Sequence, residues 1–149
     1  MLRELVEKKR TLFIDKANSW EDAIHQSCKT LLYSGVIGEN YADEIIRCIN
    51  EYGPYIVIMP GIAIPHSQEN ATGGTGIGFM KVGQRVIFDE CDPDKYANLF
   101  FTLATTDPEA HLKNMRTLSN ILTNEALIED LHKARSDDDL LLIAKKYNL

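Results

Sequence analysis

Apolar residues recur at helical spacing through the first third of the chain. Ser19 precedes the first such stretch and is followed three residues later by Asp22, a weaker form of the capping box that opens helices. Apolar positions three and four apart continue from there until Gly35 ends the run. The elements predicted for this part are a short N-terminal helix, a strand at 12–14, and helices at 19–35 and 41–52.

The middle of the chain changes to short, continuous apolar runs, which are typical of buried strands. A segment rich in Asn, Thr and Gly, from Ser67 to Thr75, interrupts them and is predicted to be a loop. The runs predicted as strands are 55–59, 62–64, 76–82, 85–88 and 97–104.

The last third returns to helical spacing. Asp107 is a good N-cap residue and Pro108 suits the first helical position, so a helix is predicted from here to Leu122. Another helix is predicted over 124–134, and Ser136 opens a final one. Helices, then strands, then helices predict an α/β fold, a mixed β-sheet flanked by helices, in one domain over residues 1–149.

Composition narrows the class of protein. The formal net charge of −6 argues against nucleic-acid binding, which depends on Lys and Arg neutralising phosphates. No apolar run approaches the roughly 20 residues that cross a bilayer, so no membrane insertion is expected. The N-terminal stretch is charged, without the apolar segment of a signal peptide. Because the three cysteines are scattered and form neither a metal-ligand spacing nor a disulfide framework, we expect a cytoplasmic protein.

His66 has the context of a reactive side chain. A buried strand leads into Pro65, which cannot continue a central ladder, so the next residue is presented at the mouth of a loop. Histidine titrates near neutral pH and can act as a nucleophile, acid or base. The alternative is a histidine that only closes a strand.

His111 is the second candidate. It lies in the first turn of the helix predicted after Asp107-Pro108, where unpaired N–H groups favour an anion. It could contact a phosphoryl group held on a neighbouring imidazole, or be an ordinary surface residue. His25 and His132 lie within amphipathic helices and are assigned structural or solvated roles.

Motifs for metals and cofactors do not occur. There is no His-x-x-x-His pair, Cys/His cluster, phosphate-binding loop or dinucleotide fingerprint, so neither a metal nor a cofactor is expected. His66 and His111 could in principle pair across the fold around a metal, which leaves a metal-dependent hydrolase as an alternative. Such sites usually include carboxylate ligands at a recognisable spacing, which the sequence lacks.

Two segments carry a family resemblance. The run Gly61-Ile62-Ala63-Ile64-Pro65-His66 resembles the Gly-x-Ala-x-Pro-His signature of the mannitol/fructose-type (type 2) enzyme IIA domains in the bacterial phosphoenolpyruvate-dependent sugar phosphotransferase system (PTS). Ala110-His111-Leu112 is similar to that family's second histidine segment. The segment Gly53-Pro54-Tyr55 most closely resembles the sequences of the ascorbate-type branch of this family.

The resemblance implies a fold like that of the mannitol-specific enzyme IIA and the role of a phosphocarrier, a phosphotransferase component. His66 would accept a phosphoryl group from the phosphocarrier protein HPr and pass it to a cysteine of an enzyme IIB domain, which works with a membrane IIC component. His111 would hold the phosphoryl oxygens. Arg47 occupies the helix in which the family has a phosphate-contacting arginine, although Cys48 replaces the usual acidic neighbour.

A regulatory role is the main alternative, because some relatives with this fold control partners through their phosphorylation state without feeding a transporter. Either role requires partners to dock around His66. From their positions in the sequence, Ile62, Ile64 or Met80 are expected to supply an apolar patch there.

Overall fold

The computed structural model describes residues 1–67 and 73–149. Helices and strands follow one another in the predicted order of helices, strands and helices. The helices are α1 (Leu2–Glu7), α2 (Trp20–Tyr33), α3 (Tyr41–Tyr52), α4 (Pro108–Leu122), α5 (Glu125–Lys133) and α6 (Asp137–Tyr147). The strands are β1 (Thr11–Ile14), β2 (Val57–Met59), β3 (Gly61–Ala63), β4 (Gly76–Ile87) and β5 (Tyr96–Ala104).

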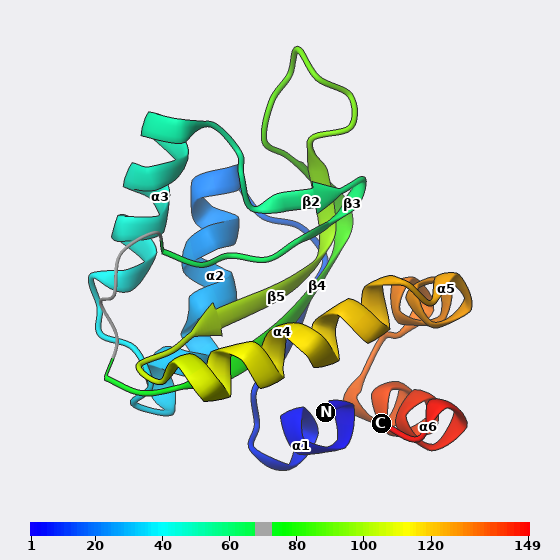
Figure 1. The fold of residues 1–149 in the computed structure, drawn as a ribbon. Helices are drawn as coiled ribbons and strands as arrows, with labels where there is room; N and C mark the ends of the chain where they lie inside the picture. The colour runs from blue at the N-terminus through cyan, green and yellow to red at the C-terminus, as the bar shows by residue number, and fades with distance from the viewer. Residues whose placement is uncertain (68–72) are drawn as a thin grey trace.

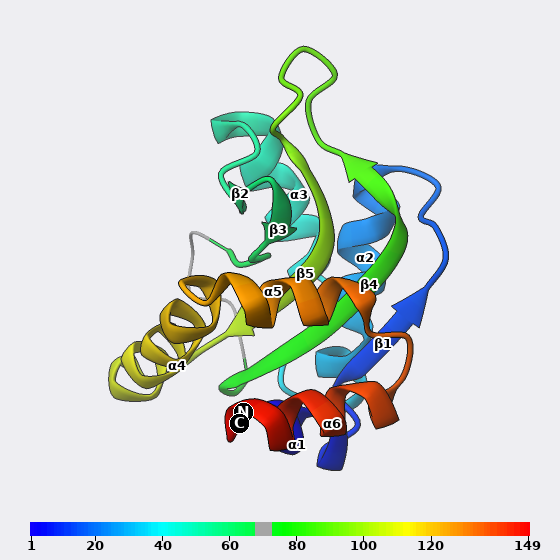
Figure 2. The ribbon, with the colours of Figure 1, turned by 90° about the vertical axis from the view of Figure 1, so that its right-hand side faces the viewer.

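The strands form one mixed sheet in the order β1-β4-β5-β3-β2. β4 and β5 pair antiparallel at its centre, β3 lies parallel to β5, and β1 lies parallel to β4. Helices α2 and α3 cover one face, and α4, α5, α6 and α1 lie on the other side (Figures 1 and 2). The predicted α/β fold with a mixed sheet flanked by helices is confirmed.

Alternating side chains of the central strands fill a core on each side of the sheet. On β5, Phe100 packs in the cluster under α2 and α3, whereas Leu99 and Phe101 pack in the cluster with α1, α4, α5 and α6. On β4, Met80 and Phe79 divide in the same way. A sheet covered on both faces requires apolar residues on both sides of each strand, which explains the continuous apolar runs in the sequence.

The predicted helix starts are confirmed by their caps. Ser19 Oγ accepts a hydrogen bond from the Asp22 amide at 3.0 Å, and the side chain of Asp107 accepts one from the Glu109 amide at 3.1 Å. Ser136 Oγ lies 3.4 Å from the amide nitrogen that it caps, that of Asp139. Each cap satisfies an amide that the first helical turn leaves unpaired.

Three predicted strand runs were wrong in their limits. The run 55–59 enters the sheet only at Val57, because the amides of Tyr55 and Val57 bond to the carbonyls of Gly53 and Pro54 in a turn. The runs 76–82 and 85–88 are one strand, β4, which continues through an irregularity in its pairing with β5. The predicted loop at 67–75 includes residues 68–72, which lie outside the described residues. Across the described ranges, no helix combines the length and apolar character needed to span a bilayer.

Candidate functional site

His66 and the helix of His111 meet at one edge of the sheet because of strand direction. β3 and β5 run parallel, so their carboxyl ends lie at the same edge. β3 leads through Ile64 and Pro65 into His66, and β5 leads through a short loop into α4, which carries His111. Functional side chains commonly gather at this edge of parallel strands. The sheet therefore brings together two segments that are far apart in the sequence.

Hydrogen bonds hold the backbone on both sides of His66. The Leu103 amide donates to the Pro65 carbonyl at 2.9 Å, which ties the loop to β5. The Tyr55 hydroxyl donates to the His66 carbonyl, and the Tyr41 hydroxyl accepts from the Ser67 amide at 3.2 Å. A histidine with its backbone fixed in this way is held in one position relative to the sheet.

The two tyrosines are the part of the site that the sequence analysis missed. Tyr41 is buried at the start of α3, and its hydroxyl also donates to the Leu103 carbonyl at 2.7 Å. Burial raises the pKa of Tyr41 to about 12, so the phenol stays protonated and remains a donor at neutral pH. The sequence gives no local sign that these hydroxyls reach the loop, since their partners depend on how α3 packs.

The imidazole of His66 is oriented by the backbone of the segment that leads into it. Its Nδ1 lies 2.6 Å from the Ile64 carbonyl oxygen. A carbonyl can only accept, so Nδ1 carries the proton and Nε2 of the neutral ring has a free lone pair. Burial lowers the pKa of His66, the hydrogen bond to Ile64 opposes that shift, and the nearby His111 adds to it. The ring is therefore favoured in its neutral, nucleophilic form.

His111 lies in the first turn of α4, as the sequence predicts. Its amide donates to the Asp107 carbonyl at 2.9 Å, so the backbone N–H is already paired within the helix. The ring Nδ1 is buried, and among the described residues it has no hydrogen-bond partner. The lowering of the His66 pKa by His111 agrees with the position of both residues at the same edge of the sheet. A second ring nitrogen without a described partner thus lies at this edge of the sheet.

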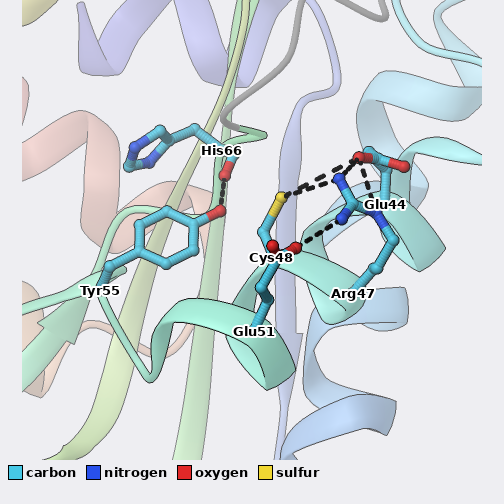
Figure 3. Close-up of polar contacts among 6 residues, drawn as sticks. All are labelled: Glu44, Arg47, Cys48, Glu51, Tyr55 and His66. Carbon is cyan, nitrogen blue, oxygen red and sulfur yellow. Dashed lines mark hydrogen bonds and ion pairs between the residues drawn. The ribbon is translucent and has the colours of Figure 1, made fainter.

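Arg47 lies on α3 and is exposed. Its guanidinium donates to Glu44 Oε1 at 2.6 Å and to Glu51 Oε2 at 2.8 Å. In Figure 3 the guanidinium points toward Glu44 and Glu51, and Cys48 lies between it and the imidazole of His66. The structure therefore brings His66 and His111 together but holds Arg47 against two carboxylates, away from the ring.

The other histidines lie elsewhere. His25 is exposed on α2, where its Nε2 is 3.2 Å from Asp43. His132 lies on α5 against β3, where a Cβ added to Gly61 would lie 3.3 Å from the His132 ring. Within residues 1–67 and 73–149, no group of three or more His, Cys, Asp or Glu side chains is arranged to hold a metal ion.

The prediction of which residues supply an apolar patch around His66 was wrong. Ile62, Ile64 and Met80 are 1%, 4% and 1% exposed, because they pack in the cores on the two faces of the sheet. The exposed apolar side chains near His111 are on its own helix, where Leu112 is 53% and Met115 37% exposed. Apolar strand residues predict burial, whereas apolar residues on a mixed helix can face outward.

Residues 4–147 match the family model described as "Phosphoenolpyruvate-dependent sugar phosphotransferase system, EIIA 2". The chain belongs to this family. It is thus an enzyme IIA component of the phosphotransferase system, a class whose members transfer phosphoryl groups, and the resemblance found in the sequence is confirmed.

Named relatives agree with this placement. The mannitol-specific cryptic phosphotransferase enzyme IIA component of Escherichia coli (strain K12) is 32% identical over 128 residues, 85% of this chain and 86% of that protein. The solution structure of the E. coli mannitol-specific cryptic enzyme IIA has a TM-score of 0.84 at 29% identity, covering 97% of this chain and 98% of the other. The ascorbate-specific PTS EIIA component of E. coli (strain K12) is 25% identical over 146 residues, 97% of this enzyme IIA and 94% of that one.

The fold is also that of an enzyme IIA solved with a partner. The complex of the E. coli mannitol enzyme IIA with phosphorylated mannitol enzyme IIB aligns with a TM-score of 0.74 at 24% identity, covering 91% of this chain and 94% of the other. At this identity the likeness establishes the fold alone, which is the predicted mannitol-type enzyme IIA fold.

Proposed function

We propose that this enzyme IIA is a phosphocarrier that accepts a phosphoryl group on Nε2 of His66 and passes it to a cysteine of an enzyme IIB domain. The observation that carries the proposal is the bond between Nδ1 of His66 and the Ile64 carbonyl. It assigns the proton to one ring nitrogen and leaves the other as the nucleophile. The lowered pKa of His66 supports the same role, since only a neutral imidazole attacks phosphorus.

Each transfer exchanges one bond to phosphorus for another. In the first, the N–P bond of a phosphohistidine donor breaks as the Nε2 lone pair of His66 forms a new N–P bond. The resulting ring is cationic, and its Nδ1–H remains bonded to the Ile64 carbonyl. In the second, a cysteine thiolate attacks phosphorus and the electron pair returns to Nε2. Both steps depend mainly on in-line positioning and on stabilising the three phosphoryl oxygens.

His111 is the residue that we propose to hold those oxygens. Its buried Nδ1 has no hydrogen-bond partner within the described residues, and its ring is near enough to affect His66. A protonated ring nitrogen donates a hydrogen bond to a phosphoryl oxygen and, when the ring is charged, a charge-assisted one. Arg47 could do the same only after releasing Glu44 and Glu51, so we propose for it a contact formed with the phosphorylated or partner-bound protein.

For partners we propose HPr as the phosphoryl donor and an enzyme IIB domain as the acceptor, with a membrane IIC component that moves the sugar. Support for IIB comes from the mannitol enzyme IIA, which was solved in complex with it. The exposed Leu112 and Met115 of α4, near His111, offer an apolar surface on which both partners could dock in turn. The same proposal places the protein in the cytoplasm, where HPr acts.

For the transported sugar we propose an ascorbate-like substrate, as the residues around Gly53-Pro54-Tyr55 suggest. The named relatives divide between mannitol and ascorbate, so they do not favour one sugar. Transfer from the phosphorylated protein to purified ascorbate-type and mannitol-type IIB domains tests the choice. Faster transfer to a mannitol-type domain would overturn it.

The carrier function is tested by intact mass after incubation with phosphoenolpyruvate, enzyme I and HPr. We expect one acid-labile phosphoryl group on the wild type and none on His66→Ala. His132→Ala is the matched control, because His132 is a half-buried histidine on α5 and should leave labelling intact. Normal labelling of His66→Ala would reject the assigned residue, and an unlabelled wild type would reject the carrier function.

A further inference from the structure

A pocket lies between α1, the start of β4, and α4. It has a volume of about 440 Å³, within the range of small-molecule sites. Its wall includes Leu5 and Ile77 as apolar side chains, and Arg10, Lys113 and Asn114 as polar ones. His66 and His111 are not among its lining residues, so the pocket is distinct from the candidate phosphoryl site, although Ala110, the neighbour of His111, is part of its wall.

The charge of this pocket is opposite to that of the whole protein. The lining carries three basic side chains and one carboxylate, in a chain whose formal net charge is −6. The carboxylate of Glu4 lies 2.6 Å from Lys8 Nζ, so these two charges neutralise each other. Arg10 and Lys113 remain, and among the described residues neither forms an ion pair. The net positive charge of the lining side chains at one concave site favours an anion.

Arg10 is fixed in place by its neighbours. Its backbone bonds to both α1 and β4, since its amide donates to the Leu5 carbonyl and its carbonyl accepts from the Phe79 amide, both at 2.8 Å. A Cβ added to Gly76 would lie 2.8 Å from Nη1 and 3.3 Å from Cζ, so the missing side chain leaves room for the guanidinium. Its Nε is buried and, within the described residues, has no hydrogen-bond partner.

We propose that this pocket binds a small organic phosphate. The guanidinium of Arg10 offers several N–H donors in a fixed plane and Lys113 adds a point charge, which together match a phosphate dianion. Asn114, one residue further along α4, contributes an amide donor. Leu5 and Ile77 form the apolar wall against which the carbon part of the ligand lies. The site is independent of the phosphoryl carrier function.

The test uses the unphosphorylated full chain with His66→Ala as background, so that an anion at the candidate phosphoryl site is not mistaken for one in the pocket. Backbone amide NMR signals are followed while glycerol 3-phosphate, inorganic phosphate and citrate are added separately at constant ionic strength. We expect saturable shifts confined to residues that line the pocket, with glycerol 3-phosphate binding tighter than inorganic phosphate or citrate.

Variants then identify the residues that bind the anion. Arg10→Gln and Lys113→Gln should each weaken glycerol 3-phosphate binding about tenfold, as expected for loss of a hydrogen bond to a charged group. Lys145→Gln, an exposed lysine near the end of α6, is the matched control and should bind like the background protein. Lys113→Gln removes an exposed side chain, so it tests the site even if Arg10→Gln fails to fold.

Three outcomes would overturn the proposal. Absence of saturable shifts in the pocket up to about 20 mM would reject an anion site, since even weak metabolite binding has dissociation constants near the millimolar range. Tighter binding of citrate would reject phosphate as the ligand class, and equal weakening by Lys145→Gln would reduce the effect to general charge. None of these measurements requires HPr or IIB, so they are separate from the test of the carrier function.

Discussion

The ring of Tyr55 stands edge-on to the imidazole of His66, with centroids 5.1 Å apart and planes at 87°, while its hydroxyl donates to the His66 carbonyl. One side chain therefore contacts both the ring and the backbone of the proposed phosphoryl acceptor. Burial raises the pKa of Tyr55, which keeps the hydroxyl protonated and able to donate at neutral pH.

Tyr55→Phe separates these two contacts, because it keeps the ring and removes the hydroxyl. We expect the free energy of unfolding to fall by about 1 kcal/mol, the usual net worth of a hydrogen bond. Phosphorylation by HPr should slow about tenfold, because the His66 loop loses a point of attachment. Stopped-flow labelling with urea denaturation measures both. Tyr52→Phe, an exposed tyrosine three residues earlier, should change neither.

The pH dependence of His66 follows from its lowered pKa. An NMR titration should place the His66 pKa below the ordinary value of 6.5. In His111→Gln it should rise but stay below 6.5, because burial is the larger cause of the shift and His111 a smaller one. A His66 pKa that falls or stays unchanged in this variant would contradict the proposed proximity of the two rings.

The same shift predicts how stability changes with acid. Between the folded pKa of His66 and the unfolded value, the unfolded chain binds more protons than the native state. The free energy of unfolding should therefore decrease as the pH falls through 6.5 toward the folded pKa, and this contribution should be constant above that window. Urea denaturation of wild type and His66→Gln across this range isolates it, because the variant lacks the titrating group.

Loss of His111 should affect transfer more than folding. His111→Ala removes a proposed donor to the phosphoryl oxygens, and we expect phosphoryl transfer to IIB to slow by about tenfold or more. Its backbone bond to Asp107 does not need the side chain, so α4 should persist in circular dichroism spectra. Asn120→Ala on the exposed part of the same helix is the control. Unchanged transfer kinetics in His111→Ala would remove the proposed role.

Arg47→Gln distinguishes a functional arginine from a surface ion pair. Its bonds to Glu44 and Glu51 are largely exposed, so the free energy of unfolding should change by less than about 1 kcal/mol. If Arg47 contacts the phosphoryl group in the partner complex, the transfer rate should nevertheless fall. Arg85→Gln, which removes a guanidinium stacked 4.1 Å from the Tyr96 ring, is the control. Equal rates for the two variants would assign Arg47 a surface role.

Gly61 is required by backbone conformation and by space. Its φ of +93° disfavours any side chain, and an added Cβ would lie 3.3 Å from His132. Gly61→Ala should therefore lower the free energy of unfolding by about 1–2 kcal/mol in urea denaturation. Adding His132→Ala should restore only part of this loss, because it removes the contact and not the strain. Gly38→Ala, with open space around its Cβ position, should be nearly neutral.

Local signals in the sequence were sufficient for the helices and insufficient for the sheet and the site. Ser19, Asp107 and Ser136 each cap a helix through atoms within three residues, so their effect can be predicted from neighbours alone. The gap predicted between the runs 76–82 and 85–88 does not end the strand, because the Gln84 amide donates to the carbonyl of Asp15, a distant residue, at 2.8 Å. Pairings of that kind are decided by distant segments.

The same distinction applies to the site. Pro65 and the start of α4 identify where His66 and His111 would be presented, but only the parallel pairing of β3 with β5 brings them together. Tyr41 and Tyr55 could not be connected to His66 because their hydroxyl partners depend on tertiary packing. The roles of His66, His111 and Arg47, and the single domain over 1–149, stay predictions.

The attachment of the His66 loop to β5 has a consequence for protein synthesis. Leu103 supplies an amide to Pro65 and a carbonyl to Tyr41, and it follows His66 by 37 positions. A nascent chain that has emerged from the ribosome only as far as β4 already exposes the histidine, but it lacks the Leu103 amide that ties Pro65 to the sheet. The proposed phosphoryl acceptor should therefore be fully anchored only when β5 pairs with β3, which would limit how far unfinished chains compete for the phosphoryl donor.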